Sequence, residues 1–411
     1  MSDAEQSSAQ PEPGAPKRRG KKRKRHTVAK VVVAALVVLG MVTGLSVVFI
    51  YRHLNGNLNV VDLTQQLGTD RPDKVAVEGP HEPLNILVMG SDARDCEGCN
   101  IDNLTGMGER SDTTILIHLS ADRTRAYGIS IPRDSMVDRP TCKSEDGGDI
   151  PGGTHVMWNE AFSVGGPACT IRQFEQLSGV LVDHFVVVNF EGFKDMVDAI
   201  GGVEVCIPED IVDPAHGINI PAGTRKLEGQ QALNYVRERY VVGNGSDIGR
   251  MKRQQAFIAS MAHQVVTAGT LANPIKVVRF LEAATQSITL DKEIGSLKKI
   301  GQLGYEFRDI GLDKIQFITI PNTVDPADAN HLVWTPEAKQ VWKKIAKDEP
   351  LTKRLAEDVI SAGNVPGTSG SSNPSGSGSS SSSPSPGGGG GGSGSTEGPD
   401  AQTLSDAGLC A

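Results

Sequence analysis

An uncharged apolar run, VVVAALVVLGMVTGLSVVFIY, occupies residues 31–51. A run of this length and composition predicts a helix that spans a membrane. About 20 apolar residues cross the ~30 Å hydrocarbon core of a bilayer as a helix, and within lipid a single segment can satisfy its backbone only as a helix. The run is longer than the apolar part of a signal peptide, and no clean small-x-small cleavage site follows it. We therefore predict an uncleaved, single-pass signal anchor.

A basic block at residues 17–25 precedes the apolar run and sets its expected orientation. Lys and Arg beside a first span hold that side in the cytoplasm. We therefore expect a cell-membrane protein with a cytoplasmic N-terminus and an extracellular domain after Arg52. Such a block could also bind nucleic acid, but topology alone accounts for it, and we expect no nucleic-acid partner.

Composition divides the rest of the chain into segments. Residues 1–30 are expected to be a basic, disordered cytoplasmic segment, and residues 52–81 a polar juxtamembrane stalk. Residues 363–411 are rich in Gly, Ser and Pro, a composition that buries too little apolar surface to offset the entropy of ordering. We predict a disordered tail there. Residues 82–348 remain as one domain with a single large core.

Six cysteines fit an extracellular domain. Disulfides are the default outside the cell, whereas a zinc site would need a second C-x-x-C or paired histidines beside Cys96 and Cys99. We therefore favour disulfides over metal. Spacing does not fix their connectivity; the best single pair is Cys142–Cys169, and Cys410 is the candidate for an unpaired thiol.

Short apolar runs alternate with amphipathic helical patterns between residues 82 and 348, which is typical of an α/β fold with a mixed sheet. Strands are expected at residues 84–89, 113–119 and 125–131. Each borders a small island of charge. The islands pair an arginine with an aspartate: Asp92 with Arg94, Arg110 with Asp112, and Arg133 with Asp134.

One such pair is usually a surface ion pair or a turn cap. Three of them at successive strand ends suggest a ligand site, because ligands of α/β sheets collect where strands end. Asp92 and Asp112 would offer oxygen donors only, a set that suits Mg²⁺. The metal would neutralise charge on a phosphoryl group.

A second concentration of positive charge lies downstream, although the whole chain carries a formal net charge of −8. It comprises Arg237, Arg239, Arg250, Lys252 and Arg253. Guanidinium groups suit phosphate oxygens. Arg237 and Arg239 share a face only in an extended segment, so the chain should leave its helix near Val236. The alternative interpretation of residues 250–253 is a solvated basic helix face.

These islands also carry a family resemblance. The motifs NILVMGSDAR, RSDT, ISIPRD, LEGQQALNYVRER and DIGRMKRQQ, between residues 82 and 262, resemble in order and spacing the LytR-CpsA-Psr family, of the actinobacterial type. The resemblance implies an α-β-α sandwich with an apolar pocket for a polyprenyl chain. It further implies a magnesium-dependent transferase that attaches a polyprenyl-pyrophosphate-linked anionic glycopolymer, such as a teichoic acid, to peptidoglycan and releases polyprenyl phosphate.

The resemblance also assigns roles to residues of this chain. Asp92 and Asp112 would hold Mg²⁺, and either one is a candidate base for the acceptor hydroxyl. Catalytic groups would be Asp92, Asp112, Arg110 and Arg133. The pyrophosphate would contact Arg94, Arg110, Arg133, Arg237, Arg239, Arg250 and Gln254.

Two alternative functions remain open: a pyrophosphatase that acts on the same lipid with the same residues, and a non-catalytic lipid-binding or regulatory envelope protein. The helical stretches at residues 251–266 and 277–284 could line the lipid pocket or belong to an ordinary core.

Overall fold

The computed structural model describes residues 25–92, 111–267, 273–356, 358–368 and 398–411, and it divides the chain into two compact units, Met1–His53 and Leu54–Ala411. Helix α1 (Arg25–Gly56) contains the predicted anchor. Its large apolar side chains are exposed from Val28 to Phe49. Among the described residues, α1 is the one helix long and apolar enough to cross a membrane.

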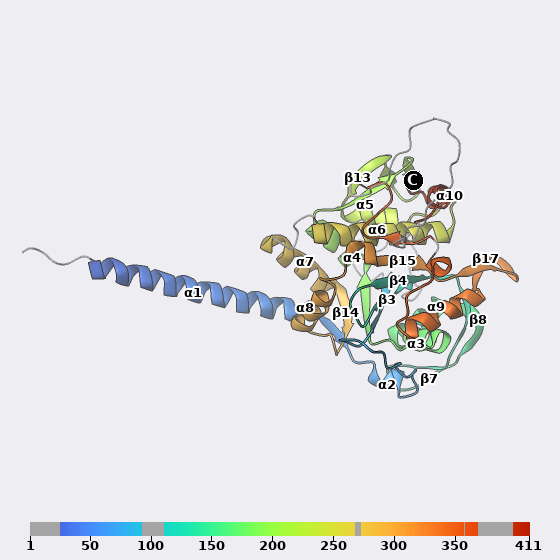
Figure 1. Ribbon diagram of the computed structural model, residues 1–411, viewed down its shortest axis with the longest axis horizontal. Helices are drawn as coiled ribbons and strands as arrows, with labels where there is room; N and C mark the ends of the chain where they lie inside the picture. Colours follow the sequence, from blue (N-terminus) through green and yellow to red (C-terminus); the bar gives the residue numbers. More distant parts are fainter. Residues whose placement is uncertain (1–24, 93–110, 268–272, 357, 369–397) are drawn as a thin grey trace, which may run out of the picture. The chain divides into compact units, whose positions relative to one another are not determined.

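The second unit is built on an eight-stranded mixed sheet with the order β1-β14-β9-β2-β3-β4-β15-β18 (Figure 1). The strands in chain order are β1 (Asn59–Val61), β2 (Leu84–Ser91), β3 (Ser111–Leu119), β4 (Ala126–Ile131), β9 (His184–Asn189), β14 (Ile288–Asp291), β15 (Ile315–Thr319) and β18 (Ile360–Ser361). Strand β3 runs antiparallel to both β2 and β4, while β9 lies parallel to β2 and β15 lies parallel to β4. The three central strands are near-continuous apolar runs because both faces of the sheet are covered.

Helices cover both faces, as predicted for an α-β-α sandwich. Figure 1 shows α3 (Glu160–Ser178) and α9 (Pro336–Ala346) on one side, and α5 (Gly229–Arg237) and α6 (Asp247–Thr267) on the other. Phe174 of α3 and Trp342 of α9 pack edge to face at 5.3 Å within the main core. The other helices are α2 (Thr64–Leu67), α4 (Phe190–Ala199), α7 (Pro274–Ser287), α8 (Leu297–Glu306) and α10 (Ala401–Asp406), with 3₁₀ turns at Leu312–Lys314 and Lys353–Ala356.

In the described part of the domain, five two-stranded sheets accompany the main sheet. They pair β5 (Met136–Arg139) with β8 (Gly153–Met157), β6 (Cys142–Lys143) with β7 (Asp149–Ile150), β10 (Val203–Ile207) with β13 (Gly223–Leu227), β11 (Ile211–Asp213) with β12 (Ile218–Ile220), and β16 (Asn322–Asp325) with β17 (Asp328–Trp334). The predicted Cys142–Cys169 disulfide is present and joins β6 to α3.

Two predictions made from composition were wrong. Residues 52–81 are not simply a stalk, because β1 pairs with β14 and Leu63 and Leu67 enter the main core. The end of the chain is not a disordered tail, because Leu404, Ala407 and Leu409 are buried with residues of α6. The Gly/Ser run lies mostly at residues 369–397, outside the described residues, and the segments flanking it carry enough apolar surface to fold.

Cys410 is also not unpaired. It forms a disulfide with Cys206 at the end of β10, 204 residues earlier in the chain. The described residues contain no free cysteine, and Cys96 and Cys99 lie outside them.

Candidate active site

Three of the predicted charged positions meet at one edge of the sheet. Ser91 of β2 pairs with Ser111 of β3, and Thr114 of β3 pairs with Ile131 of β4. Because these strands are antiparallel, the end of β2, the start of β3 and the end of β4 lie side by side. Asp92, Asp112 and Arg133 follow or occupy these positions, so sheet register gathers residues that are separated in sequence.

A chain of ion pairs crosses this edge. Arg133 Nη1 donates to Asp112 Oδ1 at 2.8 Å, and Arg133 Nε lies 3.7 Å from Asp247 Oδ1. The same Asp247 oxygen accepts from Arg250 Nε at 3.0 Å and Nη2 at 2.5 Å. Asp247 therefore begins α6 and also orients two arginines, a role that the sequence did not reveal.

These contacts set the charge states of the central pair. Burial acts to raise the pKa of Asp112, but attraction to Arg133 and Arg250 and the hydrogen bond from Arg133 outweigh it, so the pKa is lowered. Burial acts to lower the pKa of Arg133, while Asp112 and Asp247 raise it, and the net pKa is raised. Both side chains are therefore held ionised.

Arg237 and Arg239 approach the same place from α5. The helix ends at Arg237, and Glu238 has an extended backbone with φ −59° and ψ 136°. The predicted departure from the helix near Val236 is confirmed to within one residue. The Arg237 guanidinium lies 4.6 Å from the centroid of the Phe190 ring, and that of Arg239 lies 4.9 Å from the Tyr240 ring.

The arginines share a cavity of about 340 Å³, the polar cavity. Its lining residues are Asp112, Arg133, His216, Ile218, Asn234, Arg237, Glu238, Arg239, Tyr240 and Arg250. Four guanidinium groups in one cavity suit an anion with several oxygens, because each can donate two hydrogen bonds to such oxygens.

A second cavity of about 260 Å³, the apolar cavity, adjoins the first. It is lined mainly by apolar side chains of β2, β3, β9, α4, α5 and α6, and it shares Asp112, Arg237 and Arg250 with the polar cavity. Phe257, Ile258 and Met261 of α6 contribute to it, so the first of the two predicted lipid-lining stretches does line a cavity. None of the residues at 277–284, the second stretch, lines the apolar cavity.

The remaining cationic residues of α6 do not form the solvated face that was the alternative interpretation. Lys252 and Arg253 are buried. Arg253 donates to the carbonyl oxygens of Ala407 and Glu238, and Lys252 donates to that of Asp358 at 2.5 Å. These two side chains support the fold, and neither lines the polar or the apolar cavity.

The remaining predicted site residues are placed differently with respect to the two cavities. Gln254 lines the apolar cavity and donates to the Val236 carbonyl oxygen at 3.0 Å, which ties α6 to the end of α5. Asp92 is buried at the sheet edge and lines neither cavity. Arg94 and Arg110 lie outside the described residues.

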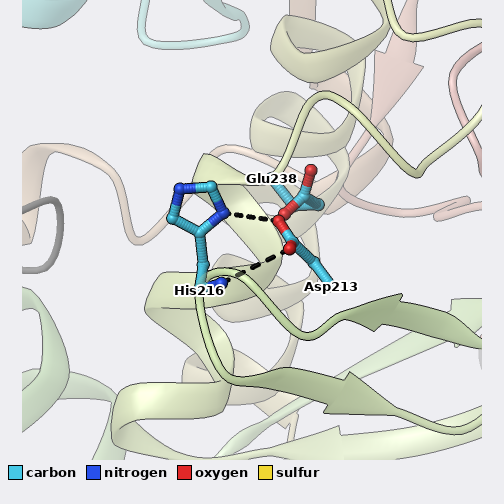
Figure 2. Close-up of side chains that lie close together, drawn as sticks. All are labelled: Asp213, His216 and Glu238. Atoms are coloured by element: carbon cyan, nitrogen blue, oxygen red, sulfur yellow. Dashed lines mark hydrogen bonds and ion pairs between the residues drawn. The ribbon is translucent and has the colours of Figure 1, made fainter.

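Sequence reasoning missed the polar cluster of Asp213, His216 and Glu238 (Figure 2), of which His216 and Glu238 line the polar cavity. Ligand atoms of Asp213, His216 and Glu238 all lie within 4.8 Å of one another. His216 Nδ1 lies 2.5 Å from Asp213 Oδ2, and Glu238 Oε1 accepts backbone N–H groups of Arg239 and Tyr240. The D-x-x-H spacing of Asp213 and His216 could have drawn attention to this pair. No neighbouring sequence feature, however, indicated that the pair lies near the arginines.

Comparison with known proteins agrees with this architecture. The sequence model of the LytR_cpsA_psr family matches residues 50–347. The cell wall biosynthesis protein LcpA of Corynebacterium glutamicum is 30% identical over 335 residues, which is 74% of this chain and 61% of that protein. The polyisoprenyl-teichoic acid–peptidoglycan teichoic acid transferase TagU of Enterococcus faecalis is 30% identical over 57% of this chain and 70% of its own length.

A solved structure shows the same fold. The LytR-Csp2A-Psr enzyme from Actinomyces oris superposes with a TM-score of 0.51 at 21% identity, covering 71% of this chain and 96% of that one. This chain spans only about three-fifths of the length of the Corynebacterium relative. Because the family match extends over most of the chain, from residue 50 to residue 347, the chain belongs to the LytR_cpsA_psr family.

Proposed function

We propose that this protein is a transferase that attaches a polyprenyl-pyrophosphate-linked anionic glycopolymer to peptidoglycan and releases polyprenyl phosphate. One observation carries the proposal: an arginine-rich cavity and an apolar cavity meet at Asp112, Arg237 and Arg250. A polyprenyl pyrophosphate has the matching form, a doubly anionic head joined to an apolar chain. The names of the LcpA and TagU relatives support the same assignment.

The reaction is a phosphoryl-type displacement. An acceptor hydroxyl on peptidoglycan attacks the phosphorus nearer the glycopolymer, the bond from that phosphorus to the bridging oxygen breaks, and polyprenyl phosphate leaves. Negative charge accumulates on the phosphate oxygens and on the leaving group. Arg133, Arg237 and Arg250 are already fixed around the cavity, so their charge stabilises the transition state with little reorganisation.

We also propose a magnesium ion at the same edge of the sheet. The Ser91–Ser111 register places Asp92 and Asp112 on adjacent strand ends, and both offer carboxylate oxygens. Asp112 has a lowered pKa and is ionised at neutral pH. These two residues would hold Mg²⁺, which would neutralise pyrophosphate charge when bound.

The same proposal includes the location of the protein. Helix α1 would anchor the chain in the cell membrane, with the basic N-terminus in the cytoplasm and the catalytic domain outside. That placement would give the domain access to both the lipid-linked polymer and peptidoglycan.

The test uses the full chain in detergent micelles with a labelled lipid-linked glycopolymer, a peptidoglycan acceptor and MgCl₂. We expect covalent labelling of the acceptor and release of polyprenyl phosphate. Asp112→Ala and Arg133→Ala should abolish labelling. Arg123→Ala, which breaks the ion pair between Arg123 and Glu306 outside the two cavities, should leave it intact.

The same assay separates the rival functions. Polymer recovered only in free form would identify a pyrophosphatase. Lipid binding without turnover, together with full activity of both site variants in restoring cell-wall defects, would identify a non-catalytic envelope protein.

A further inference from the structure

The turn between β11 and β12 places His216 in the wall of the polar cavity, with Asp213 hydrogen-bonded to it. Asp213 ends β11 and is buried, and its Oδ2 lies 2.5 Å from His216 Nδ1. The other oxygen, Oδ1, accepts the backbone N–H groups of Ala215 at 3.0 Å and His216 at 3.3 Å. The turn therefore holds the imidazole at one nitrogen and in one orientation (Figure 2).

This hydrogen bond also selects the tautomer. Because a carboxylate faces Nδ1, that nitrogen carries the proton and Nε2 of the neutral ring carries the lone pair. Nε2 points away from the carboxylates of Asp213 and Glu238 (Figure 2). The His216 side chain is 36% exposed and lines the polar cavity. The ring therefore lies, in its proton-accepting tautomer, in the wall of the cavity where the phosphates are proposed to bind.

The other acidic side chains of the polar cavity are less suited to accept a proton. Asp112 is paired with Arg133 and has a lowered pKa, which makes it a weak base. Glu238 Oε1 accepts the backbone N–H groups of Arg239, Tyr240 and Val241 and so organises that loop. An imidazole, by contrast, ordinarily titrates near neutral pH, where general bases are most effective.

The charges around the ring are mixed. Asp213 from β11 and Glu238 after α5 favour the protonated imidazolium, as does Asp112 at the sheet edge. The positive charges of the cavity arginines disfavour the imidazolium. These arginines are Arg133, Arg237, Arg239 and Arg250. A bound pyrophosphate would offset the charge of those arginines.

We propose that His216 is the catalytic base that deprotonates the acceptor hydroxyl, with Asp213 as its positioning residue; this rests on the proposed function. Nε2 takes the hydroxyl proton as the oxygen forms its bond to phosphorus. The bond from that phosphorus to the bridging oxygen breaks, its electron pair leaves with polyprenyl phosphate, and the imidazolium then returns its proton to solvent. No further reactant is needed.

The experiment compares His216→Ala and His216→Gln in the full chain in detergent micelles, with the labelled transfer assay. Gln can donate an N–H to Asp213 but cannot act as a base. This variant therefore removes the base while keeping the hydrogen bond that holds the turn. We expect kcat to fall about 100- to 1000-fold in both, with lipid affinity and melting temperature unchanged. The acidic limb of the pH profile should disappear, and added imidazole should restore part of the activity of His216→Ala.

The chain supplies a matched control. His331 Nδ1 lies 3.2 Å from Asp328 Oδ2 with the same D-x-x-H spacing, and this pair does not line the polar cavity. His331→Ala should keep wild-type activity. In Asp213→Asn, the amide oxygen can still accept the backbone N–H groups, but the amide nitrogen donates to His216 Nδ1. The imidazole proton must then sit on Nε2, which can no longer accept one. We expect a similar loss of kcat, and added imidazole should not restore it.

Two results would overturn the proposal. One is a His216→Gln protein with wild-type kcat and an unchanged pH profile. The other is tight binding of Mn²⁺ or Zn²⁺ that Asp213→Asn and His216→Ala both abolish, since this would make the cluster a metal site. If instead the wild-type protein transfers no polymer, or Asp112→Ala and Arg133→Ala remain active, it is the proposed function that fails.

Discussion

Arg250 illustrates how a single charged side chain is held in place in the polar cavity. It is only 3% exposed, lines both cavities, and is held by Asp247 one helical turn earlier. Burying an unpaired guanidinium would be costly, so the adjacent carboxylate lets the protein keep the charge in place before substrate arrives. Arg133 is held between Asp112 and Asp247 in the same way.

Replacement of Arg250 should therefore affect the transition state. We expect Arg250→Ala to lower kcat/KM by about 10²- to 10³-fold, corresponding to about 3–4 kcal/mol of lost transition-state stabilisation. Arg250→Lys should recover part of it, because an ammonium keeps the charge but not the two-pronged geometry. Steady-state kinetics of transfer, with Arg308→Ala as an exposed control, would check this. Equal kcat/KM for Arg250→Ala and wild type would exclude a role for this residue.

Lys252 predicts a pH dependence of stability. Burial lowers its pKa from 10.5 to about 8 in the folded chain. Between those two values the unfolded chain binds a proton that the folded chain has released, so the free energy of unfolding rises with pH from about 8 to about 10.5. Lys252→Met should remove this rise, whereas Lys339→Met, at an exposed position, should not. Urea unfolding of the full chain at several pH values between 7 and 10.5 measures it, and parallel wild-type and Lys252→Met curves would contradict it.

At the scale of elements, helix packing shapes the apolar cavity. Helix α4 supplies Phe193 and Met196 to its lining, and α7 packs against α4 at Gly192. A Cβ atom at residue 192 would lie 1.6 Å from Ser287 Cβ. Only glycine permits this approach of the two helices.

Gly192→Ala should therefore destabilise the domain, by about 1–3 kcal/mol from overpacking. The double variant with Ser287→Gly should recover part of the loss, because the two closest atoms belong to the serine side chain. Thermal unfolding of both single variants and the double variant gives the coupling between the two positions. Simple additivity of the two single effects would show that this contact does not limit the packing.

Filling the apolar cavity with a larger side chain tests whether this cavity binds the polyprenyl chain. Ile258→Trp places a larger ring from α6 into the lining. We expect KM to rise at least about tenfold for a long polyprenyl substrate but little for a short-chain analogue, because only the long chain needs that space. Ile275→Trp, at a 65% exposed position, is the control. Equal effects on both chain lengths would show that the cavity does not hold the polyprenyl chain.

At the scale of the whole molecule, the end of the chain returns to the active-site elements. Asn244 N–H donates to the Asp406 carbonyl oxygen at 2.9 Å, and Arg253 donates to that of Ala407 at 2.8 Å. The loop that follows Arg239 is therefore fastened by a segment more than 150 residues later. The Cys206–Cys410 disulfide fixes that segment covalently.

The two disulfides should differ in their contribution to stability. Cys206–Cys410 closes a span of 204 residues and Cys142–Cys169 one of 27. In the chain-entropy view the longer loop stabilises by about 2 kcal/mol more. The Cys206→Ser/Cys410→Ser protein should thus unfold at lower denaturant than Cys142→Ser/Cys169→Ser. The reverse order in guanidinium unfolding would contradict this expectation.

Local sequence patterns determined the membrane-anchor helix, the central strands and the arginines that line the polar cavity. The apolar run at residues 31–51 specified α1, and the runs at 84–89, 113–119 and 125–131 specified β2, β3 and β4, because a strand or helix is encoded by neighbouring side chains. Motif resemblance also identified Asp112, Arg133, Arg237, Arg239 and Arg250, all of which line the polar cavity.

Tertiary structure alone decided which distant groups meet. His216 joins the arginine cavity, Arg253 is buried against Ala407, and Cys410 bonds to Cys206, yet each of these contacts links segments that no sequence window contains. Sheet register and helix packing set such contacts, and both depend on the whole core being assembled. Sequence determined the elements and the arginines of the polar cavity, whereas the fold decided that a histidine and the C-terminal segment lie beside them.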